Sequence, residues 1–228
     1  MYKTLANKYT LEQVTLMWTS IAYNDCRQFA FFDGTYWRHP KTYFSDVNEF
    51  YTYICRNRIS DVHVKSLPDN GGREWIIDVD IKETDNDKLK LKIEVSKQVF
   101  RHFFGNSVTR IMYSGNRGIH VWLRIDRFRM SANKESRGKY YKAFVEPKVI
   151  LLNKIEPGSF IYSIKSVLED KEVKHKIDQL YKDDVGDLKQ MLHEFWPAVD
   201  RHVFCNLNQI RTPYSYNFKG KKFSTPLN

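Results

Sequence analysis

The sequence has few cysteines and no long apolar run. Its three cysteines, Cys26, Cys55 and Cys205, are odd in number, widely separated and not arranged as a CxxC pair. This pattern excludes a disulfide framework and does not indicate a zinc knuckle, so we expect buried free thiols. Neither a run of about 18 apolar residues nor a signal-peptide pattern is present, and we therefore expect a soluble intracellular protein with no membrane span.

Internal repeats, low-complexity tracts and Pro/Gly-rich linkers are also absent. The 228 residues include only 7 prolines and 10 glycines, whereas 42% are hydrophobic and 15% are aromatic. This composition supplies enough apolar surface for a packed core and excludes a disordered chain. We expect a single domain over residues 1–228.

Acidic residues are fewer than basic ones. The chain has 27 Asp and Glu against 37 Lys and Arg, which gives a formal net charge of +10. This excess favours polyanionic partners through charge neutralisation and counterion release, although many basic proteins bind no nucleic acid. The cations are scattered apart from the cluster Lys219, Lys221 and Lys222, so the chain has no basic tail.

Short patterns predict the elements of the first third of the chain. Two helices are expected to begin at capping boxes, and an aromatic segment between them is expected to form a β-hairpin. The residues concerned are Thr10 with Gln13, Asp46 with Glu49, and residues 29–37 around Asp33-Gly34.

The rest of the chain alternates between strand and helix patterns. Residues 73–125 contain two strand-like blocks separated by a helix that stops at Gly105, and residues 88–95 fit either a strand or a helix. Apolar positions recur at three and four residues from 161 to 195, which predicts one or two helices within a mainly helical insertion at about 130–197. The final segment, 200–228, has strand and turn chemistry.

A pair of aspartates marks the first candidate site. Asp78 and Asp80 alternate with the apolar residues Trp75, Ile77, Val79 and Ile81. On a strand this alternation buries the apolar face and places both carboxylates on the other, about 6.6 Å apart, where they repel each other. A hard divalent cation with oxygen ligands relieves that repulsion. The alternative is a solvated strand face.

A glycine-rich turn marks the second candidate site. Residues 110–114 and 119–125 are predicted to be strands joined by Gly115-Asn116-Arg117-Gly118, with Ile119, Val121, Leu123 and Ile125 as the buried stripe. His120 is then expected on the polar face, near Ser114 and Arg117. Free backbone N–H groups, a hydroxyl and a guanidinium suit a polyphosphate. The alternative is a hairpin turn with a structural histidine.

A third acidic residue completes a possible site. Asp200 follows the apolar pair Ala198-Val199, and Arg211, Ser215, Asn217 and Lys219 come within the next twenty residues. Three carboxylates are a common cage for two ions about 3.5–4 Å apart, which serve in-line nucleotidyl transfer. Arg211 and Lys219 would neutralise phosphate charge as it develops. The alternative is a surface aspartate followed by a solvated basic segment.

The three candidate sites, in this order, resemble the three motifs of the archaeo-eukaryotic primase family. Asp78-Val79-Asp80 resembles its first motif, Ser114-Gly115-Asn116-Arg117-Gly118-Ile119-His120 its second, and Asp200 after two apolar residues its third. The resemblance implies an α+β catalytic core with a central mixed sheet, flanking helices and a helical insertion. It also implies a DNA primase, an enzyme that makes short RNA primers on a single-stranded DNA template.

The resemblance assigns roles to individual residues. It implies that two magnesium or manganese ions are held by Asp78, Asp80 and Asp200, and that the nucleoside triphosphate is held by Ser114, Asn116, Arg117, His120, Arg211, Ser215 and Lys219. It also places Arg27 near the nucleotide. Asn116 and Asn217 depart from the basic residue and the histidine of many cellular members. No cysteine occurs from 81 to 113, so we expect no structural zinc.

Residues 73–85 and 112–130 are most similar to the baculovirus branch of this family. That similarity implies viral DNA replication in the host nucleus, with late expression factor two as an accessory subunit and a replicative helicase as a further candidate partner. Two alternatives stay open: a catalytically inert nucleic-acid-binding scaffold, and a primer-extending repair-type polymerase. It also stays open whether Tyr36, Trp37, Tyr140 and Tyr141 stack on template bases or pack internally.

Overall fold

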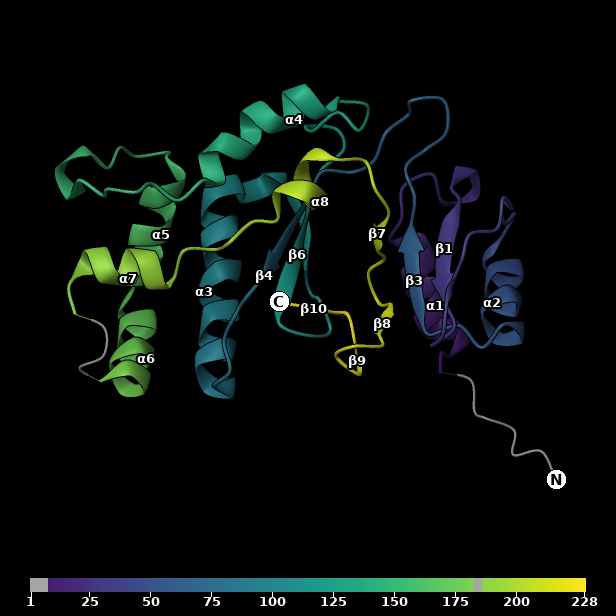
Figure 1. Ribbon diagram of the computed structural model, residues 1–228, viewed down its shortest axis with the longest axis horizontal. Helices are drawn as coiled ribbons and strands as arrows, with labels where there is room; N and C mark the ends of the chain where they lie inside the picture. The colour runs from purple at the N-terminus through teal and green to yellow at the C-terminus, as the bar shows by residue number, and fades with distance from the viewer. Residues whose placement is uncertain (1–7, 183–185) are drawn as a thin grey trace. The chain divides into compact units, whose positions relative to one another are not determined.

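The computed structural model describes residues 8–182 and 186–228 (Figure 1). The chain divides into two compact units built from discontinuous segments: the first comprises 8–73, 112–116 and 207–226, and the second comprises the described residues of 74–111, 117–206 and 227–228. Helices and antiparallel sheets are both present, which confirms the expected α+β class. The expectations of one domain over 1–228 and of an insertion at 130–197 stay predictions.

The first unit holds a four-stranded sheet of order β2-β1-β3-β7. Two α-helices, a short 3-10 helix and the small β8-β9 hairpin complete it, and β10 also belongs to it. The bounds are α1 (Leu11–Thr19), η1 (Asn24–Cys26), β1 (Phe29–Phe32), β2 (Trp37–Arg38), α2 (Val47–Arg56), β3 (Asp61–Val64), β7 (Ile210–Arg211), β8 (Tyr216–Asn217), β9 (Lys222–Phe223) and β10 (Thr225–Pro226).

Both α-helices of this unit begin at the residues predicted from the sequence. Thr10 and Gln13 form a reciprocal capping box at α1, as predicted. Asp46 caps α2, but the Glu49 carboxylate accepts from the Ser45 backbone and hydroxyl instead of completing a box. The hairpin is confirmed by the antiparallel pairing of β1 with β2 around a turn at Asp33.

Alternation along β1 separates two faces of the first sheet. Phe29 and Phe31 are buried and pack against aromatic rings that include Trp18 and Phe50 of the helices. Large rings of this kind bury much apolar area and favour tilted or edge contacts. The helices therefore cover one face of this sheet, and Ala30 and Phe32 belong to the other face.

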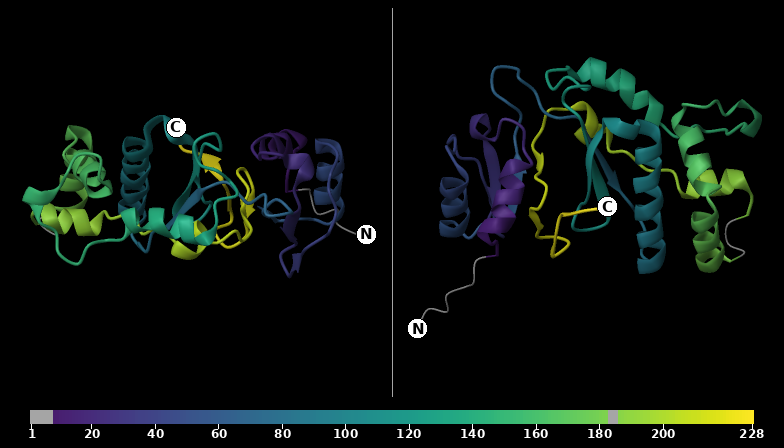
Figure 2. Two further views of the ribbon diagram at one scale, coloured as in Figure 1. Left: turned by 90° about the horizontal axis from the view of Figure 1, so that it is seen from above. Right: turned by 180° about the vertical axis from the view of Figure 1, so that it is seen from behind.

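The second unit is built around β4 and β6, which pair antiparallel, with β5 on the other side of β6. Helix α3 lies between these strands and the helices α5, α6 and α7 (Figures 1 and 2). The bounds are β4 (Ile76–Asp80), α3 (Asn86–Phe104), η2 (Gly105–Ser107), β5 (Val108–Tyr113), β6 (Gly118–Leu123), α4 (Lys134–Tyr141), η3 (Lys142–Phe144), η4 (Leu152–Lys154), α5 (Phe160–Leu168), α6 (Lys171–Tyr181), α7 (Leu188–Glu194) and α8 (Arg201–Cys205).

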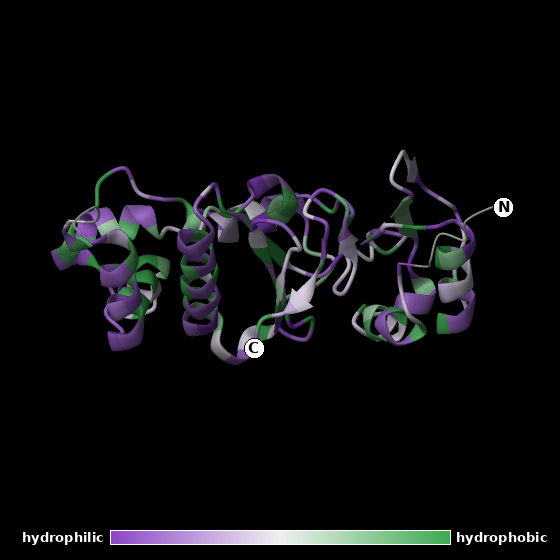
Figure 3. Ribbon diagram, turned by 90° about the horizontal axis from the view of Figure 1, so that it is seen from below, coloured by the Kyte–Doolittle hydropathy of each residue, from purple (hydrophilic) through white to green (hydrophobic). Residues whose placement is uncertain are grey.

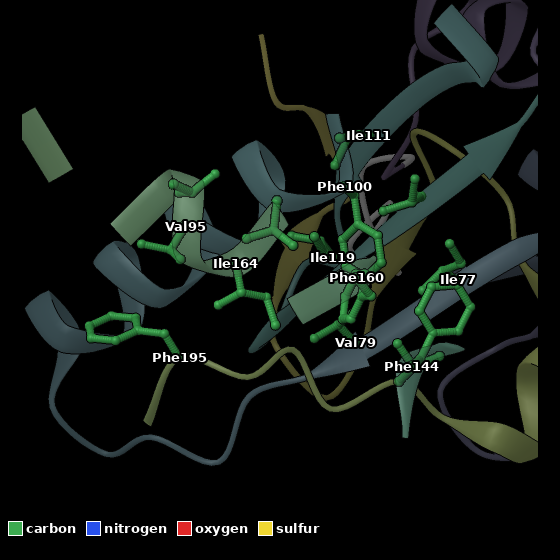
Figure 4. Packing of buried hydrophobic residues seen from close by; sticks show 14 of the residues in the cluster. Ile77, Val79, Val95, Phe100, Ile111, Ile119, Phe144, Phe160, Ile164 and Phe195 are labelled. Atoms are coloured by element: carbon green, nitrogen blue, oxygen red, sulfur yellow. The ribbon is translucent and has the colours of Figure 1, made fainter. Parts of the chain in front are cut away.

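One apolar core joins the strands and helices of the second unit. Ile77, Val79 and Ile119 of the strands belong to the same buried cluster as Val95 of α3 and Ile164 of α5 (Figure 4). Each of these side chains is fully buried. Figure 3 shows hydrophilic and hydrophobic residues together on the helices of this unit, as expected for helices with one buried side. This core holds β4 and its aspartates in a fixed position.

The structure decides between the open readings of the helical segments. Residues 88–95 are helical within the 19-residue α3, because the apolar spacing of three and four continues through Val95 to Val99. The segment 161–195 holds three helices instead of one or two, since Asp170 and Asp187 cap two new starts. Positions 183–185 of that segment lie outside the described residues.

Several sequence expectations are wrong in detail. The segment 200–228, expected to have strand and turn chemistry, begins with the helix α8 capped by Asp200. Ile125 is 39% exposed and is not part of the buried stripe, because β6 ends at Leu123. The thiol of Cys26 is exposed, and only that of Cys205 is fully buried. As for the membrane, no helix of the described chain combines the length and apolar character needed to cross a bilayer.

A carboxylate pair around Lys92 makes the stability of the second unit sensitive to acid. Lys92 Nζ lies 3.0 Å from Glu83 and 2.7 Å from Glu194. A backbone hydrogen bond from Asp85, followed by the bond from Lys92, lowers the pKa of Glu83 below its ordinary 4.5. Although burial opposes it, hydrogen bonding to both glutamates raises the pKa of Lys92. The Glu83 carboxylate therefore makes its full contribution to the free energy of unfolding above pH 4.5. This contribution is lost as the pH falls through the lowered pKa of Glu83.

We expect Glu83→Gln to lower the melting temperature at neutral pH, and the difference from wild type to shrink as the pH falls below 4.5. Thermal melts over a pH series measure this. Asp87→Asn is the matched control, because the Asp87–Lys90 pair is largely exposed and contributes little. A difference that persists unchanged into acid would show that the Glu83 charge is not responsible.

Candidate active site

The antiparallel register of β4 and β6 sets the geometry of the acidic pair. Asp78 lies opposite His120, and Asp80 lies opposite Gly118, so these four positions share one face of the sheet. The intervening Val79 lies opposite Ile119 on the buried face. The predicted alternation along this strand is confirmed.

Asp78 and His120 form the inner part of the site. The Asp78 Oδ1 atom lies 3.4 Å from His120 Nε2, and the two side chains are 24% and 7% exposed. His120 is on the predicted face, but the expectation of an open polar face is wrong at this position. Ile76 and Trp122 pair further along the same face and are also buried. Period-two alternation assigns a residue to a face and does not show what covers that face.

Asp80 and Arg117 form the outer part of the site. The Asp80 Oδ2 atom lies 3.5 Å from Arg117 Nη2, and the side chains are 59% and 41% exposed. An exposed pair at this separation contributes at most about 1 kcal/mol. Both groups therefore stay available for a charged ligand.

Gly118 allows close approach of β6 to β4 beside Asp80. A Cβ atom at this position would lie 1.8 Å from the Val79 carbonyl oxygen and 2.9 Å from its carbonyl carbon. No larger residue fits without separating the strands. The second glycine of the turn is thus required by packing against the first acidic motif.

Asp200 is connected directly to the backbone of β4. Its N–H donates to the Asp78 carbonyl oxygen at 2.8 Å, and Val199 bridges to Val79. The Asp200 side chain is exposed and accepts from Val203 N at 2.9 Å, which caps α8. The structure therefore brings the third acidic motif to the first, as the sequence order alone did not require.

The three aspartates lie on neighbouring backbone segments, and their side chains do not form a closed ligand set. Within 8–182 and 186–228, no group of three or more acidic, histidine or cysteine side chains is arranged to hold a metal ion. The donor chemistry nevertheless suits a hard divalent cation, because Asp78, Asp80 and Asp200 offer only carboxylate oxygens.

Mutation can separate the capping role of Asp200 from any role of its charge. Asp200→Asn is expected to keep the α8 cap while removing the charge, so an activity that needs this carboxylate falls and stability stays within a few tenths of 1 kcal/mol. Asp200→Ala should lose activity and also about 1 kcal/mol of unfolding free energy. Urea unfolding together with an activity assay measures both. Equal stability losses in the two variants would contradict the capping role.

The predicted residues of the first unit are largely engaged in internal contacts. Asn217 donates to the Ser114 carbonyl oxygen at 3.0 Å and accepts from the N–H groups of Lys219 and Gly220, each at 3.1 Å. Tyr113 donates its hydroxyl to the Asn116 carbonyl oxygen. Asn217, one of the two positions where the sequence departs from the family pattern, therefore holds two turns together.

Arg211 and Ser215 are tied to β3. Arg211 Nη1 lies 2.6 Å from Asp61 Oδ1, and the Ser215 hydroxyl, which is fully buried, accepts from Val62 N at 2.8 Å. Arg27 is likewise fully buried and donates to the Lys65 carbonyl oxygen. Lys219 is exposed. The roles of these residues toward a nucleotide stay predictions.

Two features of the site were not predicted. Asp61 is 3% exposed and binds both Arg211 and the Phe218 N–H group. An aspartate at the start of the apolar β3 is the only sequence signal for it. A cavity of about 210 Å³ beside Asp80 is lined by Lys92, Glu194 and Trp196, among others. Its walls come from the end of β4, from α3, and from the end of α7 with the segment after it, and no local sequence pattern connects these three parts.

Comparison with known proteins agrees with the order of the motifs. The family described as DNA primase small subunit matches residues 77–228. The chain is 42% identical over 227 residues to "DNA primase" of Autographa californica nuclear polyhedrosis virus, with 96% of this chain and 82% of that protein covered. It is also 42% identical over 228 residues to "Late expression factor 1" of Orgyia pseudotsugata multicapsid polyhedrosis virus, with 96% and 88% covered.

Proposed function

Because the chain belongs to the DNA primase small subunit family and is a DNA primase of viral replication, we propose that Asp78, Asp80 and Asp200 form its catalytic centre. The observation that carries this proposal is the backbone link from Asp200 N to the Asp78 carbonyl oxygen, which joins the first and third motifs. A DNA template and nucleotides are the substrates of this family.

The proposal assigns two magnesium or manganese ions to the three carboxylates, whose oxygen donors fit hard cations. Such ions, when bound, activate the attacking 3′-hydroxyl and stabilise the leaving pyrophosphate. His120 is placed to hold the Asp78 carboxylate in one orientation, because its Nε2 atom lies 3.4 Å from Asp78 Oδ1. Arg117 is the exposed cation beside Asp80 and would neutralise phosphate oxygens.

The proposed triphosphate contacts follow the second and third motifs. They are assigned to Ser114, Asn116, Arg117, His120, Arg211, Ser215 and Lys219. Among them, Arg117 and Lys219 have exposed side chains that suit direct phosphate contact. Arg211 and Ser215 are engaged with β3, so they would act by holding the β7–β8 segment in place.

Primer synthesis on an unprimed strand tests the proposed function. Purified protein is incubated with single-stranded DNA, labelled nucleoside triphosphates and magnesium or manganese, with and without a chelator. Short labelled products that require the metal support the proposal. Extension of an added primer without synthesis on the unprimed strand would instead favour a repair-type polymerase, and no product from folded protein in either assay would favour a scaffold.

The finer partners and the location are also proposals. We propose an accessory subunit of the late expression factor two type, a replicative helicase as a further partner, and function in the host nucleus. The support is similarity to two baculovirus proteins over 96% of this chain. Purification of a tagged chain from the nuclear and cytoplasmic fractions of infected cells, followed by identification of the copurifying proteins, tests all three. Recovery only outside the nucleus would contradict the location.

A further inference from the structure

The first sheet has an exposed aromatic face that the proposed catalytic centre does not use. Phe32 of β1 pairs with Trp37 of β2, on the face opposite the helices. The Phe32 ring lies 5.3 Å from the Trp37 ring and 5.4 Å from the Phe218 ring. We call Trp37, Phe32 and Phe218 the aromatic row.

Exposure distinguishes this row from the aromatic core. Trp37 is 37% exposed and Phe218 is 47% exposed, whereas Phe29 and Phe31 on the helix side are 1% and 0% exposed. Internal packing therefore explains the buried rings and does not explain why two large rings face solvent at the ends of one row. Adjacent exposed aromatics of this kind are typical of surfaces on which nucleobases stack.

Positive charge lies beside the row. Lys8 Nζ is 5.9 Å from the centroid of the Phe218 ring and 3.8 Å from that of Tyr216. The turn of the β8-β9 hairpin begins at Phe218 and exposes Lys221, and Lys222 at the start of β9 is also exposed. Asp61, an acidic group beside the row, is neutralised by Arg211 at 2.6 Å and by the Phe218 N–H group. The surface thus combines stacking rings with an excess of cations.

We propose that the aromatic row, together with Lys8, Lys221 and Lys222, binds the single-stranded DNA template by base stacking and phosphate neutralisation without sequence specificity. This inference rests on the proposed function, because it takes the template as the ligand. The rings of the row contact one another at 5.3 and 5.4 Å in tilted and edge-to-face arrangements, so bases would stack on the exposed parts of Trp37 and Phe218 and not between the rings. Charge complementarity with DNA supports the same occupant.

Fluorescence anisotropy with a labelled mixed-sequence oligodeoxynucleotide tests this proposal, without nucleotides or divalent ions. Trp37→Ala and Phe218→Ala are each expected to weaken binding about tenfold or more, and the double variant to weaken it further. Trp37→Tyr and Phe218→Tyr retain a ring and should stay within about threefold of wild type. Tyr140→Ala is the control, because Tyr140 is 60% exposed and packs on Trp75 outside the row.

The outcomes distinguish template binding from nucleotide binding and from a purely structural role of the row. Unchanged affinity of the folded double alanine variant would overturn the proposal, as would equal losses in the alanine and tyrosine series. Loss of nucleoside triphosphate binding with unchanged oligonucleotide binding would assign the row to the nucleotide instead and also overturn it. The assay contains no nucleotides or divalent ions, so it measures oligonucleotide binding independently of primer synthesis. A failure of primer synthesis is therefore distinguishable from a failure of this inference.

Discussion

Replacement of Asp78 or Asp80 by asparagine is expected to lower primer synthesis at least about a hundredfold while the fold is retained. Asparagine has nearly the same shape as aspartate but no charge, and β4 is held by the buried core on its other face. Each variant removes a hard anionic oxygen from the site, and no other residue on that face of β4 replaces it.

Labelled primer products resolved by size measure the loss, and circular dichroism with thermal melting confirms folding. Asp87→Asn is the matched control, because Asp87 is an exposed aspartate of α3 that pairs only weakly with Lys90. It should synthesise primers at the wild-type rate. If both the Asp78 and the Asp80 variants synthesised primers at the wild-type rate, β4 would not be part of the catalytic centre.

Substitution of Gly118 by alanine is expected to lower the unfolding free energy by about 3 kcal/mol, by forcing overlap with the Val79 carbonyl group. Relief of the overlap requires β6 to move away from β4 at the register of Asp80. Synthesis should therefore fall even at temperatures where the variant stays folded. For a chain of this size the loss corresponds to a decrease of about 6–12 °C in melting temperature.

Gly138→Ala provides the control for that substitution. An added Cβ at Gly138 would meet nothing within 4 Å, and the residue lies inside helix α4. Alanine should raise stability there by up to about 1 kcal/mol, because it favours the helix more than glycine does. A Gly118→Ala protein as stable as wild type would contradict the close approach of the two strands.

Strand alternation was sufficient to predict the acidic face of the second unit. Asp78 and Asp80 follow from the period of two, and the β4–β6 register confirms that His120 shares their face. The burial of His120 was not predictable in this way, since it depends on Trp122 and Ile76 sharing that face. Local pattern therefore assigned the face but not its environment.

Long-range contacts account for what the sequence did not predict. Asp61 and Arg211 are 150 positions apart and meet only because β3 pairs with β7. The sequence of residues 88–95 fits the periodicity of a strand and that of a helix. These residues form a helix because Leu91 and Val95 pack in the core. Asn217 departs from the family pattern, but its role in joining two turns depends on the Ser114 carbonyl oxygen. Tertiary context decided each of these cases.

Direct titration with manganese is the measurement that tests the central claim most closely. Electron paramagnetic resonance reports free manganese, so a bound ion lowers the signal without any need for catalysis. We expect wild-type protein to remove manganese from solution, and a protein in which Asp78, Asp80 and Asp200 are all asparagine to remove far less. Equal manganese binding by the two folded proteins would contradict a metal centre at these three carboxylates.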